Sequence, residues 1–149
     1  MEKLVSYPIS VVYYLCFGLT LVIFHPIQWI CLNVFGYQAH KKSVDYLNLF
    51  LVRCTNILGT TYSVKNKEVI PNNVPIIFVA NHQSLYDIIG IIWYLRRFHA
   101  KFVSKKELGK GIPSVSYNLR HGGSILIDRK DPKQAIPLIK GLSECIEKH

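Results

Sequence analysis

The chain has 149 residues, a length that suits one domain with a hydrophobic core and argues against two. Half of the residues are hydrophobic, and the mean hydropathy of +0.20 is high for a soluble protein. The formal net charge is +9, but the aromatic residues gather in the N-terminal apolar run and not among the cations, which argues against nucleic-acid binding. The four cysteines are isolated, with no C-x-x-C pair and no His at ligand spacing, so the sequence predicts no metal site.

The N-terminal region is apolar enough to enter a membrane. A run of 37 residues that starts at Leu4 contains no Lys, Arg, Asp or Glu, and about 20 apolar residues suffice to span a bilayer. Residues 4–25 are therefore predicted to cross the membrane. We expect Pro26 to break the helix, because proline lacks a backbone N–H, and residues 27–40 to form a shorter helix at the membrane interface.

A cleaved signal peptide or a buried hairpin of a soluble protein would also explain this run. The first alternative lacks a strongly basic start and a clear small-residue cleavage site. We therefore expect residues 1–40 to be a membrane-anchoring helical segment and residues 41–149 to be a separate domain.

The second part of the chain is basic. Residues 96–133 carry ten Lys or Arg against three acidic residues, which accounts for most of the net charge. Basic charge beside a membrane segment favours anionic lipid headgroups, by about 1 kcal/mol for each cation near the surface. We therefore expect a membrane with anionic phospholipid as a partner, and no nucleic acid.

Helices and strands are predicted to alternate after residue 42. The pattern predicts helices over residues 43–59 and 85–95 and a last helix starting at residues 131–132, where Asp precedes Pro. It predicts strands over residues 60–70, 74–80, 100–104 and 124–128. Such alternation is typical of an α/β fold with a mainly parallel sheet layered with helices.

One histidine and one carboxylate interrupt the most apolar stretch of this second part. His82 and Asp87 are five residues apart, so they cannot share a face of one helix. They can converge if His82 lies in the turn after a strand and Asp87 in the first turn of the next helix, with Ser84 as the N-cap. An Asp bound to one imidazole nitrogen leaves the other nitrogen available as a base. The alternative is that Asp87 only caps the helix and His82 is an ordinary turn residue.

Three segments in order resemble the glycerolipid acyltransferases of the 1-acylglycerol-3-phosphate acyltransferase family. Residues 81–87 (NHQSLYD) are similar to its N-H-x-x-x-x-D motif. Residues 105–113 (KKELGKGIP) resemble its Lys-rich segment before a proline, and residues 123–129 (GSILIDR) resemble its G-x-x-[FL]-I-D-R motif. Members of this family continue to further motifs, so the resemblance covers only the N-terminal part of the pattern, and we expect an α/β domain that is incomplete at the C-terminus.

The resemblance implies transfer of a fatty acyl group. His82, oriented by Asp87, would deprotonate the sn-2 hydroxyl of 1-acylglycerol 3-phosphate, which attacks the thioester of acyl-CoA or acyl-carrier protein and gives phosphatidic acid. Arg129, with Lys105 as a second candidate, would bind the acceptor phosphate. The supporting residues would be Asn81, Gly123 and Asp128.

The same resemblance implies no cofactor or metal beyond the acyl donor, and a membrane location with the catalytic domain on the cytoplasmic face. The alternatives are a truncated, non-catalytic membrane-bound remnant, an acyltransferase for another glycerolipid acceptor, and a basic module that binds anionic lipid. Residues 121–124 (HGGS) mimic an esterase oxyanion loop, but the chain has no G-x-S-x-G elbow, so we expect a tight turn there.

Overall fold

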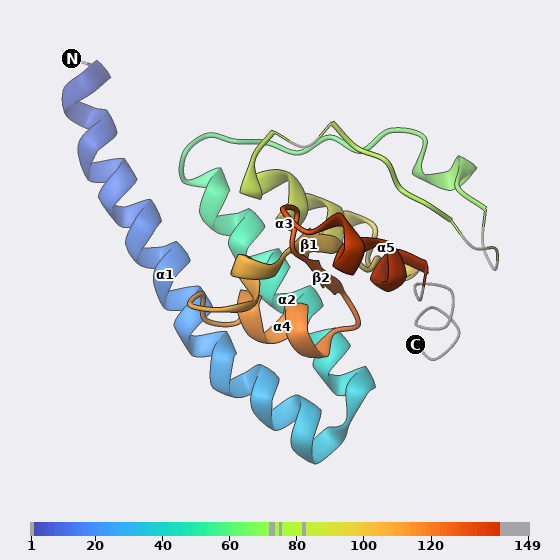
Figure 1. Ribbon diagram of the computed structural model, residues 1–149. Coiled ribbons are helices and arrows are strands. Elements are labelled where there is room, and N and C mark those ends of the chain that lie inside the picture. Colours follow the sequence, from blue (N-terminus) through green and yellow to red (C-terminus); the bar gives the residue numbers. More distant parts are fainter. Residues whose placement is uncertain (1, 72–73, 75, 82, 141–149) are drawn as a thin grey trace.

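The computed structural model describes residues 2–71, 74, 76–81 and 83–140 (Figure 1). Helix α1 spans Glu2–Phe35 without interruption and is followed by α2, Tyr37–Asn56. The two helices form a hairpin in which α1 extends beyond its partner at the N-terminal end (Figure 1). Gly36 separates them with φ of 81°, a backbone conformation that glycine adopts without steric cost.

The predicted helix break at Pro26 is wrong. Pro26 lies on the exposed side of α1 and removes one backbone hydrogen bond, while the opposite side of the helix packs on the rest of the protein. That packed stripe includes Tyr13, Leu21 and Gln28, which are all buried. Contacts along the stripe keep the helix continuous, so the chain turns at Gly36 instead.

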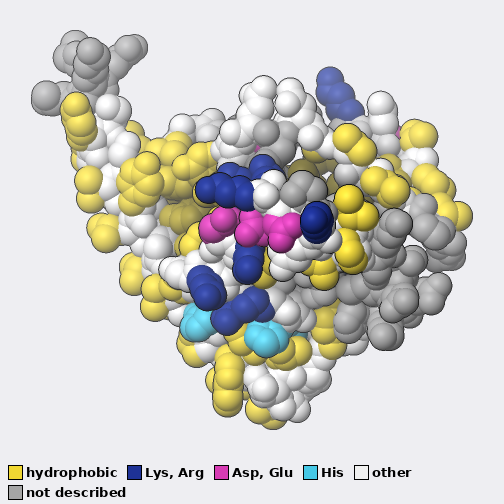
Figure 2. All heavy atoms as spheres, in the orientation of Figure 1, with side chains coloured by type: hydrophobic (Ala, Val, Ile, Leu, Met, Phe, Trp, Pro, Cys, Tyr) yellow, Lys and Arg dark blue, Asp and Glu magenta, His cyan; other side chains and the backbone are white. Residues whose placement is uncertain are grey.

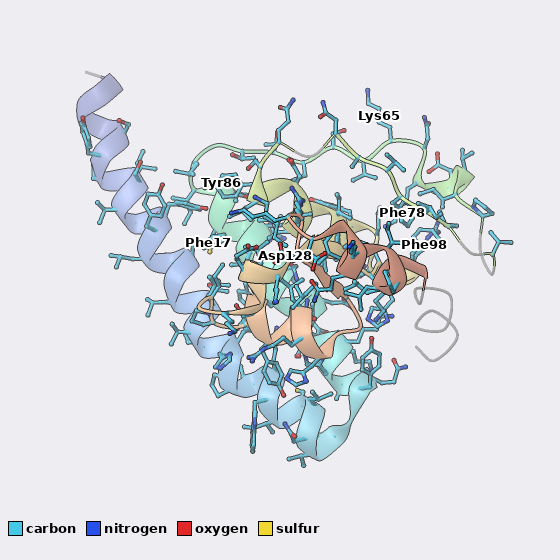
Figure 3. The ribbon with its side chains drawn as sticks, viewed as in Figure 1. Phe17, Lys65, Phe78, Tyr86, Phe98 and Asp128 are labelled. Atoms are coloured by element: carbon cyan, nitrogen blue, oxygen red, sulfur yellow. The ribbon has the colours of Figure 1, made fainter. Side chains whose placement is uncertain are left out.

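One hydrophobic core joins the first three α-helices. Leu21 of α1, Leu47 and Leu51 of α2, and Ile89 of α3 (Leu85–Tyr94) form its buried centre. Phe17 of α1 extends this core toward α3, where its ring lies 6.5 Å from the ring of Tyr86 (Figure 3). The division of the chain at residue 40 into an anchor and a separate domain stays a prediction.

The segment between α2 and α3 differs from the prediction. Residues 60–70 contain only the short helix η1 (Lys67–Val69), and the described part of residues 74–80 contains no strand. Ile77 and Val79 are 89% and 92% exposed. Their β-branched side chains suit a buried strand, but a strand also requires a hydrogen-bonded neighbour, which this part of the described chain lacks.

The remaining elements form a small α/β layer. They are η2 (Arg96–Phe98), β1 (Val103–Lys105), η3 (Lys106–Gly109), α4 (Val115–His121), β2 (Ile125–Ile127) and α5 (Pro132–Lys140). Strands β1 and β2 pair in parallel, with Val103 opposite Ile125 and Lys105 opposite Ile127. The α/β class, with an N-terminal helical segment followed by a parallel sheet layered with helices, is therefore confirmed, although the sheet is smaller than expected. Helix α4 was not predicted.

Ser114 ties this layer to α1. Its side-chain hydroxyl donates to the backbone carbonyl of Leu21 at 2.6 Å, and its backbone N–H donates to Nδ1 of His25 at 3.1 Å. Ser114 is fully buried and has a positive φ of 61°. The start of α4 is thus held against the middle of α1.

Candidate functional site

The N-terminus of α3 has the capping geometry that its sequence predicts. Ser84 is the N-cap, and its hydroxyl accepts the backbone N–H of Tyr86 at 3.1 Å. Oδ2 of Asp87 accepts the backbone N–H groups of Gln83 and Ser84, each at 2.9 Å. These bonds hold the Asp87 carboxylate at the positive end of α3.

The proposed base lies outside the described residues. His82 directly precedes Gln83 in the chain, and the backbone N–H of Gln83 donates to the Asp87 carboxylate. The pairing of His82 with Asp87 stays a prediction. Asn81, expected to support it, is exposed.

Replacing Ser84 by Ala should destabilise the protein by about 1 kcal/mol, because an N-cap side chain contributes about 0.5–2 kcal/mol to helix stability. The measurement is chemical unfolding of the detergent-solubilised chain. Ser63→Ala, at an exposed loop position, is the matched control and should change the free energy of unfolding very little. Equal stability of the two variants would contradict the capping role of Ser84.

Asp87 also borders an open, mostly apolar groove with a volume of about 240 Å³. The groove lies between α3 and the loop that follows α2, and it is lined by Tyr62, Ser63, Val64, Asp87, Gly90, Ile91, Tyr94 and Leu95. A Cβ at Gly90 would lie 2.8 Å from the Tyr62 ring. The absence of a side chain at position 90 thus allows this tyrosine to form one wall of the groove.

The predicted phosphate ligands lie at one end of the sheet. Because β1 and β2 run parallel and Lys105 pairs with Ile127, Lys105 and the residues after Ile127 leave the sheet in the same direction. The side chains of Lys105 and Arg129 are exposed. Figure 2 shows that Lys and Arg side chains gather on this face around a small acidic group. The structure thus brings the two cations to one edge.

Asp128 and Gly123 have structural roles at the two ends of β2. Oδ1 of Asp128 accepts the backbone N–H of Lys130 at 2.9 Å, which closes the turn before α5. Gly123 has φ of 83°, which confirms the expected tight turn before the strand.

Sequence reasoning missed a cluster of histidines and tyrosines where α1, α2 and α4 meet. The rings of His25, His40 and His121 lie 5.7, 5.8 and 4.5 Å from the ring of Tyr117. The ring of Tyr37 lies 5.5 Å from that of His99. Except for Tyr117 and His121, which are four residues apart on α4, the paired rings come from distant parts of the chain, so no sequence signal predicts that they meet.

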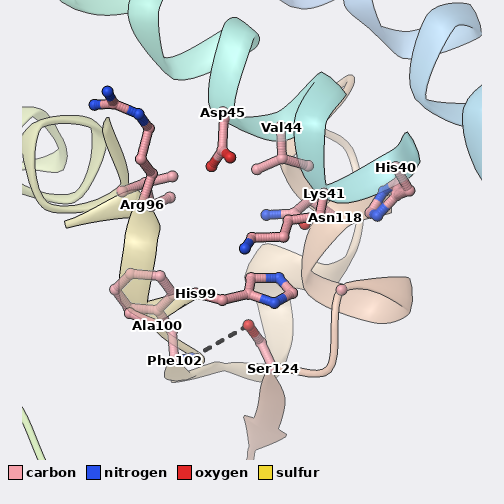
Figure 4. A pocket seen from close by; sticks show the side chains of 12 residues that line it. His40, Lys41, Val44, Asp45, Arg96, His99, Ala100, Phe102, Asn118 and Ser124 are labelled. Carbon is pink, nitrogen blue, oxygen red and sulfur yellow. Dashed lines mark hydrogen bonds between the residues drawn. The ribbon is translucent and has the colours of Figure 1, made fainter. Parts of the chain in front are cut away.

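A small cavity of about 20 Å³ adjoins this cluster (Figure 4). His40, Asp45, Arg96, His99 and Asn118 are among the residues that line it. His40 is 1% exposed, and its Nε2 has no hydrogen-bond partner among the described residues. Burial lowers the pKa of His40 to about 4, and the charges of His121 and Lys101 act in the same direction. Burial raises the pKa of the Asp45 carboxyl, whereas Lys41 and Arg96 act to lower it.

Within the part of the chain that the structure describes, no group of three or more His, Cys, Asp and Glu side chains could hold a metal ion.

The matches with known proteins all name acyltransferases. The sequence model described as "Acyltransferase" matches residues 61–149. A 1-acyl-sn-glycerol-3-phosphate acyltransferase of Helicobacter pylori is 41% identical over 76 residues, which cover 49% of this chain and 30% of the relative. A 1-acyl-sn-glycerol-3-phosphate acyltransferase of Chlamydomonas reinhardtii is 25% identical over 131 residues, which cover 87% of this chain and 38% of the relative. The chain thus spans about a third of the length of these relatives. No solved structure matches it significantly.

Proposed function

The chain belongs to the Acyltransferase family, and from this premise we propose that it takes part in transferring a fatty acyl group to the free sn-2 hydroxyl of 1-acylglycerol 3-phosphate. The product would be phosphatidic acid. The observation that carries the proposal is the family match over residues 61–149, which include the H-x-x-x-x-D segment and both strand-end cations. The names of the two relatives support the same acceptor.

In the proposed reaction His82 acts as the general base. A neutral imidazole nitrogen removes the proton of the acceptor hydroxyl while the oxygen attacks the thioester carbonyl carbon of acyl-CoA or acyl-carrier protein. The C–O bond forms, the C–S bond breaks, and the thiolate leaves with the proton that His82 carries. No enzyme nucleophile is needed, because the substrate supplies the attacking oxygen.

Asp87 would orient this base. Its Oδ2 is held by the backbone N–H groups of Gln83 and Ser84, so the carboxylate has a fixed position beside the residue that follows His82 in the chain. We expect Oδ1 to accept the second imidazole N–H, which would set the tautomer and stabilise the imidazolium that forms. The open groove beside Asp87 offers an apolar surface for the hydrocarbon part of a substrate.

The direct test is an acyl-transfer assay with the purified chain in phospholipid micelles. Labelled acyl-CoA and acyl-carrier protein are supplied in separate reactions with 1-acylglycerol 3-phosphate, and phosphatidic acid is measured. A parallel reaction with glycerol 3-phosphate as acceptor shows whether the chain acylates this related acceptor instead. If the chain binds lipid but forms no product with either donor, the non-catalytic alternative is supported.

The basic face favours one second candidate, a module that binds anionic lipid without catalysis. Lys and Arg side chains gather on the face that carries the strand ends (Figure 2). Binding to vesicles containing phosphatidylserine, but not to neutral vesicles, would be common to both functions. Only product formation separates them.

We also propose that α1 associates with a membrane. Its segment Ser6–Phe35 includes an 18-residue stretch with a mean hydropathy of 1.9 and is long enough to cross a bilayer, a test that a soluble core helix or a signal sequence can also pass. Apolar side chains such as Val11, Leu15, Leu19 and Val22 are 57–60% exposed on the side away from the core. Lipid would cover this surface. We expect the domain to face the cytoplasm.

A carbonate wash should leave the intact chain in the membrane pellet. Replacing Leu15, Leu19 and Val22 by Lys should release it, because these side chains are exposed and the buried stripe of α1 is unchanged. The matched control replaces three exposed loop residues, Thr60, Thr61 and Ser63, by Lys. Release of the unmodified chain by carbonate would contradict insertion.

A further inference from the structure

The first turn of α3 is held from outside at Tyr86, the residue before Asp87. The backbone N–H of Tyr86 donates to the hydroxyl of the N-cap Ser84 at 3.1 Å. Its carbonyl oxygen accepts the hydroxyl of Tyr62, from the loop after α2, at 3.3 Å. Its half-buried ring lies against α1. The position of Tyr86 therefore depends on the N-cap, on the loop and on α1.

Two aromatic rings of α1 contact the ring of Tyr86. The Tyr13 ring lies 6.2 Å from it at an interplanar angle of 71°, and the Phe17 ring lies 6.5 Å from it at 86° (Figure 3). Both are edge-to-face arrangements, which aromatic pairs favour. Tyr13 and Phe17 are four residues apart on one side of the helix, with their rings 5.5 Å apart. The three rings form one group, which we call the Tyr86 cluster.

The burial of Tyr13 shows that this contact is a close one. Tyr13 is 2% exposed, whereas Tyr14 and Leu15, the next two residues of α1, are 68% and 60% exposed. Two of the four ring contacts given for Tyr13 and Phe17 are therefore made with a single side chain of α3, that of Tyr86. The Tyr86 cluster thus fixes the first turn of α3 relative to α1.

The position of Tyr86 in turn controls the Asp87 carboxylate, because the two residues are adjacent in the first turn of α3. Oδ2 of Asp87 accepts the backbone N–H groups of Gln83 and Ser84, which precede the helix. Both bonds require the first turn of α3 to keep its orientation relative to this preceding backbone. Hydrogen bonds weaken steeply away from their preferred geometry, so a shift of Tyr86 would weaken both.

Ordinary core packing is the simpler explanation of the Tyr86 cluster, and α1 itself offers a comparison. Phe24 is half-buried like Phe17 and packs against the same hydrophobic core. The ring contact of Phe24, at 5.6 Å, is with Phe50 of α2, which does not adjoin a candidate site residue. A contrast between Phe17 and Phe24 therefore separates a positioning role from packing alone.

We propose that Tyr13 and Phe17 are positioning residues for the Asp87 carboxylate and act on it through Tyr86. Helix α1 then supports the candidate site directly, in addition to its proposed association with a membrane. The effect on catalysis rests on the proposed acyl transfer, in which Asp87 orients His82. The effect on the hydrogen bonds of Asp87 does not depend on that function.

Hydrogen exchange of the full chain in detergent micelles tests the positioning directly. The amides of Gln83 and Ser84 report the two bonds to Asp87. In Phe17→Leu and in Tyr13→Leu their protection should fall by about 2- to 10-fold relative to the unmodified chain, the scale of one edge-to-face aromatic contact. Unchanged protection in both variants would overturn the proposal.

Phe24→Leu is the matched control for this experiment. It replaces the same kind of side chain on the same helix, so it should leave the Gln83 and Ser84 amides protected as in the unmodified chain. The amide of Leu95, which donates to the carbonyl of Ile91 at the far end of α3, should keep its protection in every variant. Equal loss of protection at Gln83 and Ser84 in the Phe17 and Phe24 variants would show general loosening and would also overturn the proposal.

A double-mutant cycle tests the effect on catalysis. In the acyl-transfer assay Phe17→Leu should lower kcat by about 2- to 10-fold and leave KM for both substrates nearly unchanged, because no substrate contact is removed. In an Asp87→Asn background the same substitution should have no further effect on kcat, because the carboxylate on which it acts is absent. A full additional loss in that background would mean that Phe17 acts on packing alone. If the unmodified chain forms no product, the proposed function fails, and the exchange of the Gln83 and Ser84 amides still decides the positioning.

Discussion

Replacing His82 by Ala should lower the rate of acyl transfer at least ~100-fold, the usual scale for loss of a general base. The loss should appear in kcat/KM for both substrates, since the same deprotonation accompanies attack on any acyl donor. The measurement is formation of phosphatidic acid by the chain, or, if its own activity is too low, by a chimera that carries the C-terminal part of the Helicobacter pylori relative after residue 149.

The control for this prediction is a second variant at the next position in the chain. Gln83→Ala keeps the backbone N–H that donates to Asp87 and removes only an exposed side chain. It should retain most of the activity. Asp87→Asn should lower the rate as well, because an amide oxygen supports an imidazolium less well than a carboxylate. Full activity of a correctly folded His82→Ala variant would rule out the proposed mechanism.

Replacing Arg129 by Lys should raise KM for the phosphorylated acceptor by about 10-fold or more, because hydrogen bonds to charged groups contribute about 1.5–3 kcal/mol. The planar guanidinium can bind two phosphate oxygens at once, whereas an ammonium offers a point charge. The KM for acyl-CoA should change little. The measurement is steady-state kinetics with each substrate varied in turn.

Lys130→Ala is the matched control for the acceptor site. Lys130 is the next cation along the chain, its side chain is exposed, and its backbone N–H, which alanine retains, makes the bond to Asp128. This variant should behave like the unmodified protein. Equal kinetic constants for the Arg129 and Lys130 variants would mean that the phosphate binds elsewhere on the basic face.

The sequence by itself determined the features that depend on contacts between residues close together in the chain. The capping of α3 is an example, because Ser84 and Asp87 bond to backbone groups at most four residues away. The turn at Gly123 and the parallel strands around residues 103 and 125 were also predicted, with bounds that differ by one to three residues. Family membership followed from three short motifs in order, and the match over residues 61–149 confirms it.

Other features were decided only by the tertiary structure. Pro26 ought to end a helix by its own chemistry, but contacts along the opposite side of α1 maintain the helix to Phe35. Residues 76–80 have the composition of a buried strand, yet Ile77 and Val79 remain exposed. A strand depends on hydrogen bonds to a neighbour that is distant in the chain, and composition alone carries no information about that neighbour.

The histidine cluster likewise could not be predicted from the sequence alone. In the sequence the six histidines are scattered, and nothing distinguishes His40 or His99 from surface residues. The hairpin of α1 and α2 and the packing of α4 bring His25, His40 and His121 around Tyr117. The burial that lowers the pKa of His40 arises only when these elements pack together, because desolvation is a property of the assembled surroundings and not of the residue.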